Sequence, residues 1–251
     1  MTKHFIHSYK VEVAQKATSN KNVFLDCDFA KLLTKKSKLR YDINVAELYD
    51  KLDELKNSIF ACTNHKTIHR RIYTFFRKYY PNVMFWFRTV EPGYRMAPSI
   101  CGEYCSFTND IKLVYVVDRN CSTDYVQMTP RSWNKLKFNI CEVLSHELVH
   151  YSQHMLSGNG FYKSKIHDFS EFINKQSFLD ECNYLSEDIE LEAFAHTAVV
   201  ERLRYKNART YYRISEMLHI LKSNNCPQDK ITHITTTFNN SLNFWKQLYK
   251  F

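Results

Sequence analysis

Hydrophobic residues recur at three- and four-residue steps over long stretches of this chain, which is the spacing of amphipathic helices. The first stretch covers residues 42–62, and the second covers residues 66–80, where Pro81 should end the helix. Further helices are expected in the C-terminal part, at about residues 186–205, 208–222 and 228–249. The first 40 residues are polar and rich in lysine, and we expect a partly ordered arm there.

A different pattern lies between these helical stretches. Residues 83–87 and 111–117 are mainly β-branched and aromatic, so both are predicted to be strands. Thr129 and Pro130 then form a helix start, with an apolar stripe after them as far as Gly158, a typical stop signal. Helices, then a short sheet, then long helices predict an α+β fold. We expect residues 1–95 to form a mainly helical N-terminal region and residues 96–251 to form a second domain.

The composition supports a folded protein. Hydrophobic residues make up 44% of the 251 and aromatic residues 15%, which argues against disorder. The chain starts without the apolar segment of a signal peptide, and no apolar stretch is long enough to span a membrane. The eight cysteines are therefore expected to be reduced thiols in the cytoplasm. Cys101 and Cys105 have no second pair at zinc-ribbon spacing, which argues against a structural zinc there.

The helix predicted to begin at Pro130 carries the sequence HELVH at residues 146–150. Side chains four residues apart on a helix project from the same face, so His146 and His150 can bind one Zn²⁺ together. Glu147 lies beside the open position of such a metal, where it can take a proton from a zinc-bound water and pass it to a leaving amine. Apolar neighbours indicate that the helix is largely buried, a setting in which polar groups need a partner.

A catalytic zinc keeps three protein ligands and one open position, so a third ligand is required. Residues 184–196 are predicted to be helical and carry Glu190 and Glu192 beside small residues. These glutamates are about 200° apart around a helix, so only one of them can face the metal. His154 would have to bend far back to join His150 and is expected on the surface, while His167 is a less favoured candidate.

The sequences HELVHYSQ at residues 146–153 and ELEAFA at residues 190–195 together resemble the gluzincin-type zinc metallopeptidases. They are most similar to the small members found in phage, viral and bacterial genomes, and the resemblance covers roughly residues 111–200. It implies a zincin-like catalytic domain, with zinc bound by the two histidines and one glutamate and with Glu147 as the general base. It also implies that residues 111–117 are the edge strand along which an extended peptide binds. For a chain encoded by a phage or virus, the cytoplasm would be that of the host.

The family commonly places a small residue three positions after the glutamate ligand and a polar residue four positions after it. Glu192 fits this pattern with Ala195 and His196, whereas Glu190 does not fit at the fourth position. We therefore expect Glu192 to be the third ligand, with Glu190 as the alternative. His196 stands where several members of the family have an acid. Tyr184 and His196 are the candidates for a group that stabilises the transition state.

The formal net charge is +9, and basic residues gather with aromatic ones in residues 65–88. A solvated surface is the ordinary explanation, but arginine beside aromatic residues also suits nucleic acid or an acidic partner. The alternative to a metallopeptidase is therefore a basic protein that binds nucleic acid or a host partner and uses an inactive zincin fold as scaffold. The intact Glu147 favours an enzyme that hydrolyses protein or peptide substrates, because a scaffold does not need that carboxylate.

Overall fold

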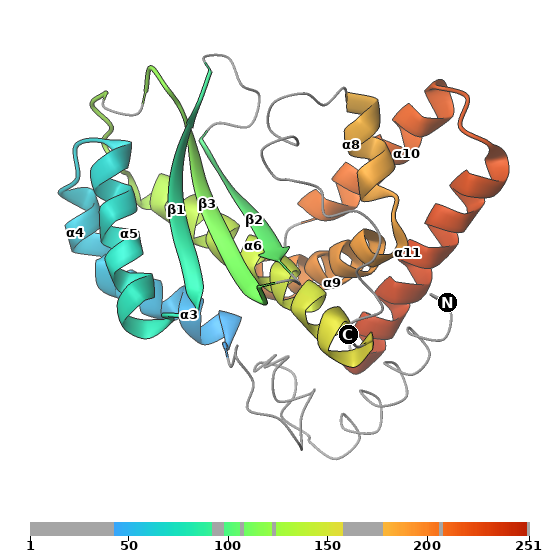
Figure 1. The fold of residues 1–251 in the computed structure, drawn as a ribbon, viewed down its shortest axis with the longest axis horizontal. Helices are drawn as coiled ribbons and strands as arrows, with labels where there is room; N and C mark the ends of the chain where they lie inside the picture. The colour runs from blue at the N-terminus through green and yellow to red at the C-terminus, as the bar shows by residue number, and fades with distance from the viewer. Residues whose placement is uncertain are drawn as a thin grey trace. The chain divides into compact units, whose positions relative to one another are not determined.

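We describe the chain from a computed structural model, which defines residues 43–91, 98–105, 108–121, 124–157, 178–205 and 208–249. Within these ranges the fold is α+β, as predicted, with a three-stranded sheet and several helices (Figure 1). The expected N-terminal arm, Gly158 and His167 lie outside the described residues. The elements in order are α3 (Val45–Lys51), the 3₁₀ helix η1 (Leu52–Leu55), α4 (Lys56–Phe60), α5 (His65–Tyr79), β1 (Val83–Val90), β2 (Ser99–Cys105), β3 (Asp110–Asp118), α6 (Pro130–Ser157), α8 (Phe178–Leu185), α9 (Asp188–Tyr205), α10 (Arg209–Ser223) and α11 (Gln228–Leu248).

The sheet has the strand order β1-β3-β2, with β1 parallel and β2 antiparallel to β3. Both predicted strands are confirmed as β1 and β3. The expectation that residues 111–117 form an edge strand is wrong, because β3 pairs on one side with β1 and on the other with β2. The sequence pattern did not reveal β2, whose two cysteines, glycine and glutamate stand where strands usually carry β-branched residues.

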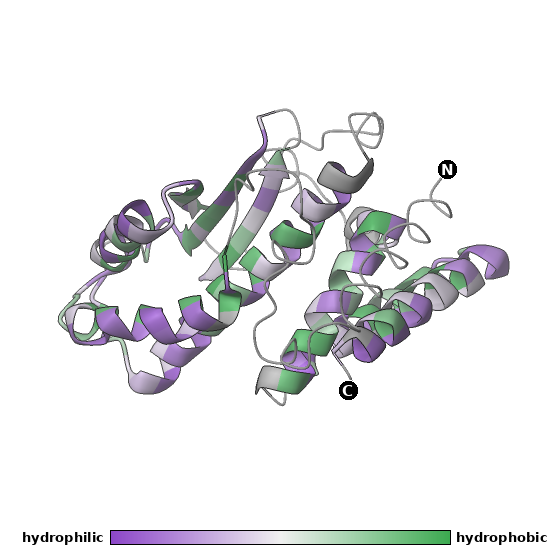
Figure 2. Ribbon diagram, turned by 90° about the horizontal axis from the view of Figure 1, so that it is seen from below, coloured by the Kyte–Doolittle hydropathy of each residue, from purple (hydrophilic) through white to green (hydrophobic). Residues whose placement is uncertain are grey.

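Helix α5 packs against β1, and its predicted bounds are confirmed to within a residue. The side chain of Asn64 caps the helix by accepting a hydrogen bond from the Thr67 amide at 2.9 Å. The buried Phe76 ring stacks on Phe85 of β1, with the ring centroids 5.3 Å apart. Hydrophobic and hydrophilic residues alternate along such helices (Figure 2), so one face joins the core and the other meets solvent.

Helix α6 begins at the predicted residue and runs without a break for 28 residues. The Thr129 side chain accepts a hydrogen bond from the Ser132 amide at 3.2 Å, which confirms threonine as the N-cap. Trp133, Ile140 and Leu144 are almost fully buried along one stripe of the helix. The hydrophobic pattern therefore predicted the element that carries the HELVH sequence.

The predicted helix over residues 42–62 is broken in the structure. The 3₁₀ helix η1 interrupts it between α3 and α4. Within η1, Asp53 accepts a hydrogen bond from the Trp133 indole at 3.3 Å and pairs with the Lys137 ammonium at 2.7 Å. These contacts reach helix α6, far along the chain, so the local spacing of apolar residues did not reveal them.

Contacts divide the described chain into two compact parts, and the division falls inside α6, after Tyr151. The sheet spans the boundary expected at residues 95/96, because β1 lies before it and pairs with β3 beyond it. In the C-terminal part, α9 and α11 pack together along much of their length. Ile234, Leu242 and Trp245 of α11 are almost fully buried. No helix among the described residues has the length and apolar character needed to cross a membrane.

Candidate metal centre

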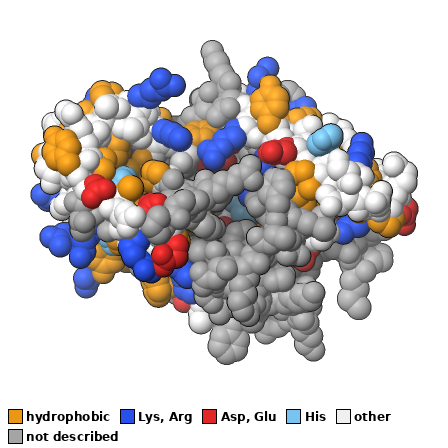
Figure 3. Space-filling model, turned by 90° about the horizontal axis from the view of Figure 1, so that it is seen from above, with side chains coloured by type: hydrophobic (Ala, Val, Ile, Leu, Met, Phe, Trp, Pro, Cys, Tyr) orange, Lys and Arg blue, Asp and Glu red, His pale blue; other side chains and the backbone are white. Residues whose placement is uncertain are grey.

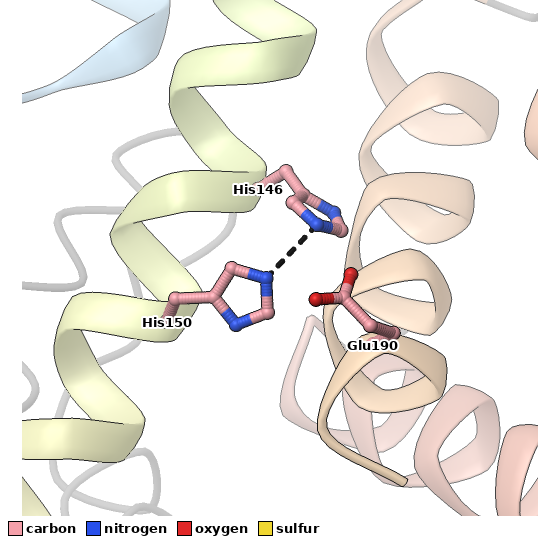
Figure 4. Close-up of side chains that lie close together, drawn as sticks. All are labelled: His146, His150 and Glu190. Atoms are coloured by element: carbon pink, nitrogen blue, oxygen red, sulfur yellow. Dashed lines mark hydrogen bonds between the residues drawn. The ribbon is translucent and has the colours of Figure 1, made fainter. Parts of the chain in front are cut away.

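His146 and His150 project from the same face of α6, as their spacing predicts (Figure 4). Their Nε2 atoms are 3.0 Å apart. Two nitrogens bound to one tetrahedral Zn²⁺ at about 2.0–2.1 Å would lie about 3.3 Å apart. His150 is buried and His146 is partly exposed. The distance between the two Nε2 atoms is therefore close to that of two ligands of one metal. When no metal is bound, one ring must donate an N–H to the other.

Glu190, near the start of α9, completes a group of three potential ligands. One of its carboxylate oxygens and one ring nitrogen each of His146 and His150 all lie within 4.8 Å of one another (Figure 4). Glu190 is 3% exposed, so its carboxylate is largely removed from water. Two imidazoles and one carboxylate can hold a metal ion, and this is a donor set that zinc commonly accepts.

The sequence favoured Glu192 as the third ligand, whereas the glutamate that groups with the two histidines in the structure is Glu190, the alternative. Glu192 is also buried, and its Oε2 accepts a hydrogen bond from the Gln153 amide at 3.1 Å. The same Gln153 Nε2 donates to the backbone carbonyl of Ile189 at 3.1 Å. The two glutamates face different ways around α9, as their angular separation predicted. The spacing typical of the family pointed to Glu192, the glutamate that accepts a hydrogen bond from Gln153.

Tyr184, one of the two residues expected to stabilise the transition state, contacts one of the three potential metal ligands. Its hydroxyl donates to Oε1 of Glu190 with an O···O distance of 2.6 Å. The other candidate, His196, has Nε2 2.8 Å from the Tyr249 hydroxyl and stacks edge-on against Trp245. His196 is therefore part of the packing between α9 and the C-terminal end of α11.

Glu147, the expected general base, is 6% exposed and lies against β2. A Cβ built on Gly102 would stand 2.5 Å from Oε1 of Glu147 and 2.8 Å from its Cγ. The absence of a side chain at Gly102 lets α6 bring this carboxylate against the backbone of β2. A glycine inside a strand often marks such a close approach. With only four glycines in the chain, Gly102 was the sequence signal that another element packs closely against this strand.

The Cys101 and Cys105 thiols do not form a metal site together. Both lie in β2, where residues four apart are separated by about 13 Å. Two thiolates bound to one zinc must lie within about 4 Å of each other. His154, on the last turn of α6, is partly buried and is absent from the group of potential ligands.

Comparisons with known protein families, with curated protein sequences and with solved structures found no match for this chain.

Proposed function

We propose that this chain is a zinc-dependent metallopeptidase that hydrolyses peptide bonds with Glu147 as general base. The observation that carries the proposal is the group formed by His146, His150 and Glu190, whose ligand atoms lie within 4.8 Å of one another. Its two histidines stand on α6, the helix that also presents Glu147, one residue after His146, and Glu190 stands on α9.

The donor set also suits Fe²⁺, since two histidines and one carboxylate are the ligands of many oxygenases. Glu147 favours zinc and hydrolysis over that alternative. A second carboxylate beside the metal ligands serves proton transfer, and an oxygenase does not need it. When bound, the zinc would supply a Lewis acid that polarises the carbonyl and lowers the pKa of water.

The residues of the chain account for the remaining steps. Glu147 accepts a proton from the attacking water and then delivers it to the amine that leaves. Its burial beside Gly102 keeps the carboxylate fixed in place, so little reorganisation is needed during proton transfer. His146 and His150 would hold the metal from one rigid helix.

The strand that would bind the substrate is β2, in place of residues 111–117. Among the described residues, β2 pairs on one side only, with β3. An extended peptide added to its other side would gain backbone hydrogen bonds. Because Glu147 lies against Gly102 in this strand, a peptide bound there would have its backbone beside the base.

The test compares the wild type with Glu147→Gln in a peptide-library cleavage assay, together with metal analysis. We expect about one Zn²⁺ per chain in both proteins and cleavage by the wild type alone. Glu142→Gln, a change of the same kind on the same helix, is the control and should cleave normally. Absence of metal from the wild type, or equal cleavage by Glu147→Gln, would refute the proposal.

A second candidate function is binding of nucleic acid by the outer face of α5. This helix has no acidic residue, and Lys66, Arg70, Arg71 and Arg77 are exposed on it. None of these four cations forms an ion pair with another described residue. Lysine and arginine side chains are visible over the part of the molecule that holds α3 to α5, on the left of Figure 3. Like charges one turn apart destabilise a helix by about 0.2–0.5 kcal/mol per pair, and a polyanion would relieve this repulsion.

Tyr73, which is 40% exposed, lies on the same face and offers a ring for stacking. The affinity for a labelled DNA or RNA oligonucleotide should fall steeply with salt. A plot of the logarithm of the binding constant against that of the salt concentration should fall by about 0.7–0.9 for each phosphate contacted. Arg70→Glu should lower both the affinity and this slope. Lys222→Glu, at an exposed position on α10, is the control. Equal binding by both variants would refute a role for α5.

A further inference from the structure

The carboxylate of Glu190 is held by a tyrosine only six residues away in the chain. Tyr184 stands near the end of α8, and its hydroxyl is 2.6 Å from Oε1 of Glu190. Hydroxyl donors to ionised carboxylates typically lie at about 2.5–2.7 Å, shorter than bonds between neutral groups. The contact therefore has the length expected of a strong, charge-assisted hydrogen bond.

The turn between α8 and α9 fixes the backbone on both sides of this contact. The amide of Glu187 donates to the carbonyl of Tyr184 at 3.0 Å, and the amide of Leu191 donates to the carbonyl of Glu187 at 2.9 Å. Cys182 and Leu185 are almost fully buried and anchor the end of α8. The phenol therefore reaches Glu190 from a short hairpin that constrains both residues.

A carboxylate offers two oxygens with about four lone-pair directions. A hydrogen bond to Oε1 leaves Glu190 able to bind a metal while restricting rotation of the carboxylate. Without this bond, more rotamers would be open to the side chain, and the cost of selecting one would oppose metal binding. Partners of this kind around metal ligands typically contribute about 10–100-fold to metal affinity.

We propose that Tyr184 is a positioning residue of the metal centre, which orients Glu190 toward His146 and His150. This inference rests on the metal-binding part of the proposed function and is independent of peptidase activity. It differs from the role expected from sequence, in which Tyr184 would stabilise a transition state. That role would change the rate of hydrolysis and leave zinc affinity unaltered, whereas positioning changes zinc affinity.

The experiment measures Zn²⁺ affinity of the metal-free, full-length chain by competition with a chromophoric chelator. We expect Tyr184→Phe to bind zinc about 10–100-fold more weakly than the wild type. Thermal unfolding of metal-free Tyr184→Phe should remain cooperative, with a midpoint lowered only by the loss of one hydrogen bond, because phenylalanine keeps the ring. Tyr212→Phe, at a tyrosine that is 76% exposed on α10, is the matched control and should bind zinc normally.

A double-mutant cycle gives the second measurement. Because Tyr184 acts through Glu190, adding Tyr184→Phe to Glu190→Gln should weaken the residual zinc binding by less than threefold. Unchanged zinc affinity in Tyr184→Phe would overturn the inference, as would an equal further loss in the Glu190→Gln background. A wild type that binds no zinc would instead refute the proposed function, so the two failures are distinguishable.

Discussion

Gly102 and Glu147 are packed so tightly that no side chain fits between the backbone of β2 and the α6 helix. A Cβ at Gly102 would stand 2.5 Å from Oε1 of Glu147 and also 2.5 Å from Cγ1 of Val143, one turn earlier. The glutamate end could swing away, but the valine is β-branched and stiff at χ1. A methyl group here would therefore displace either the base or the helix.

Gly102→Ala should lower peptide hydrolysis by about 100-fold, because a displacement of the base near 1 Å has effects of that size. Overpacking should also cost about 1–3 kcal/mol of unfolding free energy. Zinc affinity, measured by chelator competition, should change much less than hydrolysis. Cys101→Ala, at the neighbouring position of the same strand, is the control. Full activity in Gly102→Ala would show that the close approach does not matter for the base.

The two glutamates of α9 should respond differently to isosteric replacement. Glu190→Gln should weaken zinc binding by more than the 10–100-fold typical of an outer partner, because it removes a ligand. Glu192→Gln should keep zinc affinity within about tenfold, since the amide can still bond with Gln153. Isothermal titration with Zn²⁺ of both metal-free proteins distinguishes them. The reverse ranking would restore Glu192 as the ligand.

The features that the sequence predicted correctly are those that depend on residues close together along the chain. The cap at Thr129, the length of α6 and the shared face of His146 and His150 all follow from local spacing. The choice between Glu190 and Glu192 did not follow, because it depends on what each carboxylate meets from other helices. Tyr184 turns toward one and Gln153 toward the other, and neither contact leaves a periodic pattern.

The same limit applies to the sheet. Strand β2 carries Gly102 where the close approach of Glu147 leaves no room for a side chain, and a glycine inside a strand weakens the strand pattern in the sequence. With β2 unrecognised, β3 was expected at the edge, although it lies in the centre.

Lys137 is 1% exposed, yet it carries an ammonium group, which pairs with Asp53 at 2.7 Å. Asp53→Ala should destabilise the protein by about 1–3 kcal/mol, because it leaves the buried cation without its carboxylate. The cost stays below that of a fully buried pair because Asp53 is 51% exposed. Lys137→Met should cost less than about 1 kcal/mol, since it removes the charge and keeps the apolar stem. Urea unfolding of the two variants tests this order, and a larger loss in Lys137→Met would contradict it.

Burial lowers the pKa of His65 below its ordinary value of 6.5, and Nδ1 of this histidine is 2.5 Å from the Tyr115 hydroxyl. The unfolded chain therefore takes up a proton near pH 6.5, while the folded chain does so only at lower pH. His65 thus makes the unfolding free energy fall as the pH drops below about 6.5, by at most about 1.4 kcal/mol per pH unit. In metal-free protein between pH 7.5 and 5.5, His65→Gln should lose less stability than the wild type. Parallel losses would exclude His65 as a source of the pH dependence.

The unbroken helix α6 carries both the metal-binding pair and, three residues after His150, the glutamine that binds the Ile189 carbonyl and Glu192. Helical geometry fixes the angle between His150 and Gln153, because each residue adds about 100° of rotation and 1.5 Å of rise. An insertion of one residue between them would turn the glutamine away from α9 while leaving both histidines in phase. The number of residues between His150 and Gln153 is therefore fixed by the contacts that each must make. Substitutions elsewhere on α6 should be tolerated far more easily than insertions or deletions within it.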